Sequence, residues 1–348
     1  MVAAPDSDSS LSRPNSPLSP EAIIGSLLNY PHYDTEPHIG THFNDPSTQL
    51  SAILKAPNSD QLIKDLATLV SHRGVVFFSS QDLTIQEQLE LGRRLGELSG
   101  KPKSSTLHRH PISEDTPELG ADVSVISSMG GIAKAGYKEK KRASMCDGWH
   151  ADITFEPVPS DYSLLKMHTL PPTGGDTLWA SGYEAYDKLS PALQKFLEGL
   201  TAVHSGEIFL DYAKKFDLKI NTPRGSPENN ADTGLVAIHP VIRTNPVTGF
   251  KSLFVNKSFT KRIVELTPDE SDHLLEYLFR HVSENHDMQV RYKWKLNDLA
   301  IWDNRSAFHT ATHDYTAFRQ GNRVVSIGEK PFFDPKSKSR REALGFPV

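Results

Sequence analysis

The sequence predicts a mostly β domain, a sandwich or jelly roll with a few flanking helices. Three observations support this fold class: many short runs of alternating or β-branched residues, glycine and proline turns between them, and amphipathic stripes confined to a few segments. Short strands separated by turn signals are typical of sandwiches and barrels. The sequence shows no internal repeat, so the strands are expected to form one unit.

The first part of the chain predicts a polar arm ahead of a folded domain. Residues 1–50 are expected to be disordered or irregular, since the stretch 5–20 is dominated by Ser, Pro, Asp and Asn. Residues 51–348 are expected to form a single domain. This domain begins with two predicted helices, at 60–72 and after Thr84, and two predicted strands, at 74–78 and 123–126.

The second half of the chain predicts most of the strands. Thr267 is expected to begin a helix, because Glu270 stands at capping-box spacing and Pro268 suits the first turn. The segment 209–227 predicts an irregular insert. The other expected elements are a helix at 181–200, a glycine turn and strand at 173–179, and strands at 162–170, 235–242, 251–255, 290–294, 299–302 and 323–327.

The bulk composition argues against some classes of partner. A formal net charge of −5 offers no basic field for a phosphate backbone, so no nucleic-acid partner is expected. No apolar run approaches the roughly 20 residues that span a bilayer, so no membrane partner is expected either. Cys146 is the only cysteine, which prevents an intramolecular disulfide and favours a reducing, cytoplasmic compartment.

The segment 148–155 carries the most informative chemistry. It reads Gly-Trp-His-Ala-Asp-Ile-Thr-Phe, and its β-branched and aromatic residues predict a strand. In a strand, His150 and Asp152 would point to the same face. They would supply two-thirds of the 2-His-1-carboxylate set that binds ferrous iron and leaves coordination positions open. The alternative is a strand histidine bonded to a neighbour and a solvated aspartate, because so short a pattern often arises by chance.

Three residues farther along the chain extend this pattern. His309 follows the run Ile-Trp-Asp-Asn-Arg at 301–305 and offers a second imidazole. Thr177 lies on the strand after the glycine turn, and Arg323 lies on the strand after His309. A 2-oxo diacid that chelates iron needs a cation for its remote carboxylate, and an Arg fork with a hydroxyl beside it suits that task.

With these motifs in order, the chain resembles the taurine dioxygenase family of iron- and 2-oxoglutarate-dependent oxygenases. That family has H-x-D/E, a Thr or Ser about 25 residues later, and a distant His followed about 10 to 13 residues later by Arg. Here 24 residues separate Asp152 from Thr177, 131 separate Thr177 from His309, and 13 separate His309 from Arg323. The surrounding sequence also matches, in WHADITFEP, LPPTGGDTLWASG, HPVIRTNPVTGFKSLFVN and AIWDNRSAFH. The resemblance covers 74–331, about three-quarters of the chain.

The resemblance implies a double-stranded β-helix, in agreement with the jelly roll that the strands indicate. It assigns Fe(2+) to His150, Asp152 and His309 as the catalytic metal site, and the distal carboxylate of 2-oxoglutarate to Thr177 and Arg323. It implies a dioxygenase that uses 2-oxoglutarate and O2 to hydroxylate a small organic acid. One candidate substrate is a sulfonate, from which sulfite would be released, and the alternative is a carboxylate or a secondary metabolite.

The resemblance also suggests residues that would bind the organic acid. His110, in LHRHP, matches the family's sulfonate-binding histidine, and the backbone of Ile153 would face the substrate. Phe259 is a candidate wall, for which a place in the core is the alternative. The family's taurine enzyme has a second Arg four positions after the Arg that binds the carboxylate, where this chain has Ile327. Arg319 could compensate, with an ordinary surface position as the alternative.

Two other classes of protein remain as alternatives. A zinc hydrolase could use a His-Asp-His set with an activated water, but it would leave Thr177 and Arg323 without a role. A binding protein without turnover could keep the scaffold, but it would not need the complete set. The Gly- and Lys-rich segment 129–141 is a hypothetical lid over the site. A homo-oligomer is left open.

Overall fold

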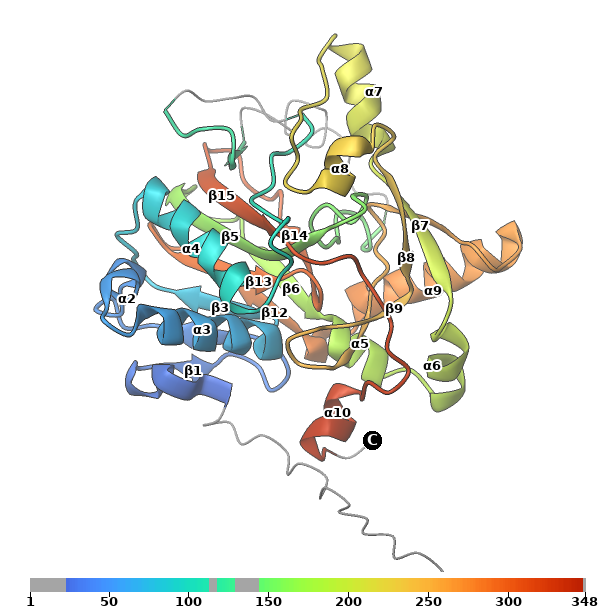
Figure 1. The fold of residues 1–348 in the computed structure, drawn as a ribbon, viewed down its shortest axis with the longest axis horizontal. Helices are drawn as coiled ribbons and strands as arrows, with labels where there is room; N and C mark the ends of the chain where they lie inside the picture. Colours follow the sequence, from blue (N-terminus) through green and yellow to red (C-terminus); the bar gives the residue numbers. More distant parts are fainter. Residues whose placement is uncertain (1–22, 113–117, 129–143, 347–348) are drawn as a thin grey trace, which may run out of the picture.

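A large mixed sheet forms the centre of the computed structural model, which describes residues 23–112, 118–128 and 144–346 (Figure 1). Within these residues the sheet has seven strands in the order β1-β2-β3-β13-β5-β15-β4, and only the β2–β3 pair is parallel. Its strands are β1 (Tyr33–Asp34), β2 (Thr41–Phe43), β3 (Val75–Phe78), β4 (Val123–Ser127), β5 (Ser160–Thr169), β13 (Leu299–Asp303) and β15 (Gln320–Ile327).

A smaller sheet packs against one face of the large sheet. It has the order β12-β6-β14, with β6 (Thr177–Ser181), β12 (Gln289–Tyr292) and β14 (Ala307–Ala311). An aromatic layer fills the space between the two sheets and places Trp179 opposite His309 in the β6–β14 register. The layer joins Val75, Phe77, Leu165, Met167, Ala300 and Trp302 of the large sheet to Trp179, Val290, Tyr292 and Ala307 of the smaller one, with Ile39 and Trp294.

Helices cover the other face of the large sheet (Figure 1). Apolar residues of α2 (Leu50–Lys55), α3 (Ser59–Arg73) and α4 (Ile85–Leu98) pack on the outward side chains of β3, β5 and β13. Burying these apolar side chains is the main stabilising term for this layer. The other helical elements are η1 (Gly25–Asn29), α5 (Gly182–Asp187), α6 (Pro191–Leu197), α7 (Glu207–Lys215), α8 (Pro227–Ala231), α9 (Pro268–Glu284), η3 (His286–Met288) and α10 (Arg340–Leu344).

Two further small sheets extend the fold. One has the order β11-β7-β8, and the other is the hairpin β10-β9. Side chains of these strands pack with α5 and α9 in a second apolar core that also contains Trp149. Their bounds are β7 (Thr201–Ser205), β8 (Val236–Pro240), β9 (Ile242–Thr244), β10 (Lys251–Leu253) and β11 (Thr260–Ile263).

Most of the predicted elements are confirmed, and the helices are more numerous than expected. Thr84 and Thr267 each cap a helix through a complete capping box. The predicted helix at 181–200 is wrong as one element, because α5 ends at Asp187 and a new helix, α6, begins with Ser190 as its cap and Pro191 in its first turn. The predicted irregular insert at 209–227 is wrong in its first part, where α7 forms. The fold is therefore a mixture of sheets and helices.

The described part of the N-terminal arm packs on the domain. Ile24 and Leu27 are buried in the core beneath α3, and β2 pairs with β3. The predicted domain boundary at residue 50 stays a prediction, although order in these residues begins before it. The hypothetical lid at 129–141 lies outside the described residues. In the part of the chain that is described, no helix has the length and apolar character that crossing a bilayer requires.

Candidate active site

Two histidines and an aspartate from distant parts of the chain meet at one point. His150 and His309 face each other in an isolated antiparallel bridge, where each backbone N–H donates to the other's carbonyl oxygen, at 3.0 and 2.7 Å. Their ring centroids lie 4.2 Å apart. Asp152 Oδ1 lies 3.7 Å from His150 Nε2 and 3.9 Å from His309 Nε2. One donor atom from each residue therefore lies within 4.8 Å of the others, as a shared metal ion requires.

The predicted strand at 148–155 is wrong. His150 makes only a single bridge, and residues 152–155 form a turn that a hydrogen bond from Glu156 N to Ile153 O closes at 2.9 Å. Ile153 has a φ of +52°, a conformation that strains a β-branched residue and ends a strand. This turn, and not strand alternation, brings the Asp152 carboxylate beside His150.

Neighbouring groups fix the direction of the Asp152 and His150 side chains. Ser163 Oγ donates to Asp152 Oδ2 at 2.7 Å, and the Asp152 backbone N–H donates to Asn304 Oδ1 at 2.9 Å. His150 Nδ1 lies 2.8 Å from Gly148 O. Because a carbonyl oxygen only accepts, Nδ1 carries the proton and Nε2 presents its lone pair toward Asp152.

The electrostatic surroundings favour the protonation states that bind a cation. Burial, with a smaller effect of His150, lowers the pKa of His309 to about 3, so its imidazole is neutral at pH 7. Burial alone would raise the pKa of the Asp152 carboxyl. The positive charge of Arg323 is the largest of the effects that outweigh burial and hold this pKa below its ordinary value. Neutral imidazoles and an ionised carboxylate are the forms that ligate a metal.

Arg323 lies against this cluster. It projects from β15, is almost fully buried, and donates from Nη1 to Asp152 Oδ1 at 2.6 Å. The predicted partner in carboxylate binding, Thr177, has a different contact, since its Oγ1 accepts a hydrogen bond from Trp294 Nε1 at 3.0 Å. Arg323 therefore contacts the candidate metal ligand Asp152 directly.

Arg319 lies beside the glycine turn that leads to Thr177. Its Nε donates to Gly175 O at 3.0 Å, and a Cβ at Gly175 would come within 2.9 Å of Arg319 Cδ, so only glycine fits there. Arg319 is 4% exposed, which excludes the surface alternative. Its Nη2 has no hydrogen-bond partner among the described residues. A buried guanidinium N–H without an acceptor is costly, and an anion would relieve that cost.

The predicted substrate residues gather on one side of the metal ligands. His110 is buried, and its ring meets Phe209 edge-on with 4.8 Å between centroids. Phe259 lies 5.9 Å from the ring of His150 and packs with Phe209. Ile153 belongs to the same apolar cluster. The structure therefore brings His110, Ile153 and Phe259 together beside the triad.

Similarity to known proteins extends over most of the chain. The family described as taurine catabolism dioxygenase TauD, TfdA family matches residues 36–325. The chain belongs to this family. An alpha-ketoglutarate-dependent dioxygenase of Neocamarosporium betae, btcD, is 46% identical over 343 residues, which cover 94% of this chain and 98% of the relative. A putative alpha-ketoglutarate-dependent sulfonate dioxygenase of Schizosaccharomyces pombe is 37% identical over 302 residues, covering 86% and 72%.

A solved structure supports the same membership. The crystal structure of a putative alpha-ketoglutarate-dependent taurine dioxygenase from Burkholderia xenovorans matches with a TM-score of 0.67 and 30% identity, covering 88% of this chain and 92% of that one. The predicted family and enzyme class are confirmed: the chain is a dioxygenase that depends on Fe(II), 2-oxoglutarate and O2. The donor set of two imidazoles and one carboxylate fits ferrous iron.

In this dioxygenase, Ser163→Ala is expected to weaken metal binding without removing a ligand. The Ser163 hydroxyl holds the second oxygen of Asp152. Loss of such a partner typically costs about 10–100-fold in metal affinity. An anaerobic titration with Mn(II) measures the change. Ser283→Ala removes another buried hydroxyl, one that donates to Phe279 O, and serves as the control. Equal affinities for both variants would contradict the expected role of Ser163.

Phe209 is a residue of this dioxygenase site that the sequence interpretation missed. It contacts His110, Phe155 and Phe259 from α7, within the segment predicted to be irregular. The available signal is the spacing of Phe209 and Ala213, the two buried residues of α7, which lie four apart on one helical face. The helix is short and largely exposed, so this signal is weak.

A buried ion pair between Glu156 and Arg224 connects the turn after Asp152 to the segment around α8. Arg224 Nε donates to Glu156 Oε1 at 2.8 Å, and both side chains are fully buried. His108 Nε2 lies 3.2 Å from the same oxygen. Arg224 also donates to the carbonyl oxygens of Asn229 and Asp232. The pair therefore anchors the segment around α8 beside the dioxygenase site.

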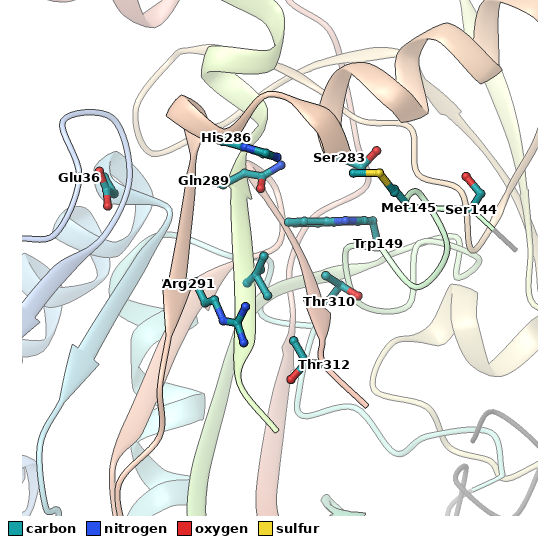
Figure 2. Close-up of a pocket in the computed structure, with 11 residues that line it drawn as sticks. Glu36, Ser144, Met145, Trp149, Ser283, His286, Gln289, Arg291, Thr310 and Thr312 are labelled. Carbon is teal, nitrogen blue, oxygen red and sulfur yellow. The ribbon is translucent and has the colours of Figure 1, made fainter. Parts of the chain in front are cut away.

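A cleft of about 720 Å³ lies beside β14, the strand that carries His309. Figure 2 shows Trp149, Thr310, Thr312 and Arg291 around it. Thr310 is the neighbour of His309 in β14, and adjacent residues in a strand point to opposite faces. The three metal ligands do not line this cleft. It is therefore separate from the side where His110 and Phe259 lie.

Proposed function

We propose that this dioxygenase hydroxylates a small organic acid whose anionic group binds Arg323 and His110. The observation that carries the proposal is the Arg323 guanidinium at 2.6 Å from Asp152, which puts a buried cation where a substrate beside the iron would lie. His110 is close enough that Arg323 and His108, after burial, lower its pKa. A neutral His110 can donate one hydrogen bond to an anion without a charge of its own.

We propose that Arg319, rather than Arg323, holds the distal carboxylate of 2-oxoglutarate together with Thr177. Two methylene groups separate this carboxylate from the chelating end of the molecule, so its cation should lie away from the ligand set. The Nη2 of Arg319, which has no hydrogen-bond partner in the described part of the chain and lies next to the turn before Thr177, supports this assignment. Because Thr177 Oγ1 already accepts from Trp294, its O–H remains to donate to a carboxylate.

Assigning the distal carboxylate of 2-oxoglutarate to Arg319 changes which substrate class is expected. Counted from Arg319, the position four residues later is Arg323, so the second Arg expected of a sulfonate enzyme is present. Ile327 then has no substrate role and is fully buried in the apolar cluster. A sulfonate is therefore the leading substrate class, and the Schizosaccharomyces pombe relative is named for sulfonates. A carboxylate or secondary metabolite is the alternative, because the name of the more similar btcD gives no sulfonate.

The residues of the site would divide the work of the reaction. Iron held by His150, Asp152 and His309 supplies O2 activation coupled to decarboxylation of 2-oxoglutarate to succinate and CO2. Arg319 and Thr177 orient 2-oxoglutarate, and Arg323 and His110 orient the organic acid. The rings of Phe209 and Phe259 exclude water between the two molecules. If the hydroxylated carbon bears a sulfonate, the product releases sulfite and leaves an aldehyde.

The proposed substrate class is tested by succinate and sulfite formation. Purified protein is incubated with Fe(II), ascorbate, 2-oxoglutarate and O2 across matched sulfonates and carboxylates of equal chain length. We expect succinate and sulfite in equal amounts with at least one sulfonate. Succinate that only carboxylates stimulate would contradict the sulfonate proposal and leave the dioxygenase class intact.

The finer structural expectations fit this function. We propose that the two packed sheets form the double-stranded β-helix predicted from the resemblance, which the similarity to a taurine dioxygenase structure supports. A single domain from residue 51, a cytoplasmic location and a homo-oligomer stay predictions. So does the absence of nucleic-acid and membrane partners.

A further inference from the structure

A row of aromatic rings begins at the metal ligand His309. The centroid of its ring lies 4.9 Å from that of Trp302 and 6.5 Å from that of Trp179. These two indoles are 5.8 Å apart, and Trp179 lies 6.2 Å from Trp294. All three indoles are buried between the two sheets. The row therefore leads away from the metal through the centre of the protein.

The row continues from the core to the surface. Trp294 lies 5.3 Å from Tyr292, Tyr292 lies 5.5 Å from His42, and His42 lies 5.4 Å from Tyr33, measured between ring centroids. Tyr33, on the edge strand β1, is 50% exposed. Each ring is within 6.5 Å of the next, so the aromatic path from His309 to solvent has no gap.

Both tyrosines in the row have a base beside the phenol. Tyr292 donates to Asp298 Oδ2 at 2.9 Å, and the Tyr33 hydroxyl lies 3.0 Å from His42 Nδ1. His42 Nε2 faces the Tyr292 hydroxyl at 3.5 Å, so this imidazole stands between the two phenols. A tyrosine loses its phenol proton when it loses an electron, and a nearby acceptor allows both to leave together. These contacts suit electron transfer as well as packing.

The dioxygenase reaction creates a need for such a path. O2 accepts four electrons on reduction to two oxygen atoms at the level of water. Conversion of 2-oxoglutarate to succinate and CO2 supplies two of them, and hydroxylation of the organic acid supplies the other two. When the organic acid is absent, two oxidising equivalents remain in the site. The nearest oxidisable side chains to His309 in the aromatic layer are Trp302 and Trp179.

We propose that these rings form an electron relay through which an external enediol reductant, such as ascorbate, removes the two unused equivalents. When an indole near the metal loses an electron, the next ring of the relay replaces that electron. The reductant replaces the last one at the surface. Two electrons and two protons reduce the second atom of O2 to water, while ascorbate loses two electrons and two protons to become dehydroascorbate. The relay consists of Trp302, Trp179, Trp294, Tyr292, His42 and Tyr33.

The surface end distinguishes a relay from an ordinary aromatic core. Buried indoles contribute apolar area wherever they lie, and they need no further explanation. Tyr33 adds little to the core, because half of it is exposed, yet it meets His42 by both ring contact and hydroxyl. Tyr277 offers a matched comparison: it is 48% exposed and stacks on His281 at 5.8 Å, far along the chain on α9.

The test compares Tyr33→Phe with wild type and with Tyr277→Phe during turnover without an organic acid. Phenylalanine keeps the ring but is not oxidised under these conditions. Samples with Fe(II), 2-oxoglutarate, O2 and ascorbate are frozen for electron paramagnetic resonance, and parallel samples are digested for mass spectrometry of oxidised tryptophan. We expect a tyrosyl radical in wild type. In Tyr33→Phe we expect several-fold more oxidation of Trp302 and Trp179, and less ascorbate consumed per succinate.

The outcomes separate the relay from the reaction on which it rests. Equal tryptophan oxidation and equal ascorbate consumption in all three proteins, with succinate still formed, would overturn the relay alone. An effect of Tyr277→Phe as large as that of Tyr33→Phe would also overturn it, because the path would not be specific. If wild type forms succinate with an organic acid but none without it, no unused equivalents arise and the relay alone is overturned. If it forms succinate in neither case, the dioxygenase assignment fails as well.

Discussion

Asp152→Ala is expected to remove both iron binding and turnover. The substitution deletes the one anionic ligand of the triad and leaves the buried Arg323 guanidinium without its 2.6 Å partner. Removing a hydrogen-bond partner outside the ligand set typically lowers metal affinity about 10–100-fold. Removing the ligand Asp152 itself should lower the affinity further. Bound iron per chain and succinate formed per minute measure the two effects.

The graded control for this substitution is Ser163→Ala, which keeps all three ligands. We expect its iron affinity to fall between those of wild type and Asp152→Ala. An Asp152→Ala protein that is folded by circular dichroism, binds iron like wild type and forms succinate would contradict the metal site.

Substitutions of Arg319 and Arg323 are expected to affect different molecules. Arg319→Met should raise the KM for 2-oxoglutarate, because it leaves a buried carboxylate without its cation. A loss of this kind costs about 2–5 kcal/mol, which is roughly 30-fold to several thousand-fold in affinity. Arg323→Met should raise the KM for the organic acid and lower the ratio of product to succinate, while the KM for 2-oxoglutarate changes little.

The two variants serve as controls for each other, since both remove a buried guanidinium near the site. Steady-state kinetics with each molecule varied in turn separates the two effects. The reverse pattern, with 2-oxoglutarate affinity lost in Arg323→Met, would restore the assignment made from sequence spacing. A sulfonate would then lack its second Arg, because Ile327 would occupy that position.

The candidate metal ligands could be predicted from sequence as a set, whereas the contacts of the two arginines could not. His150, Asp152, Thr177 and His309 are fixed by motif wording and by separations along the chain. Arg319 and Arg323 both follow His309 at separations near the family range, so spacing alone does not choose between them. The choice depends on packing: one guanidinium lies on the glycine turn and the other on Asp152.

Local sequence patterns also do not predict the backbone conformation of the site. The β-branched and aromatic letters of the H-x-D segment favour a strand, yet tertiary contacts hold Ile153 at a φ of +52°. The Asp152 backbone is fixed by Asn304, which lies far along the chain and which no local pattern could indicate. Elements with their own signals, such as the helix capped by Thr267 and Glu270, were predicted correctly.

We propose that His150, Asp152 and His309 bind the metal and that Arg319 receives the co-substrate. A crystal structure with Mn(II) and N-oxalylglycine, a non-reactive analogue of 2-oxoglutarate, tests both parts through the anomalous signal of manganese. We expect the ion between His150, Asp152 and His309, with the distal carboxylate on Arg319 and Thr177. Manganese bound elsewhere while the triad stays empty, or a distal carboxylate on Arg323, would contradict the account.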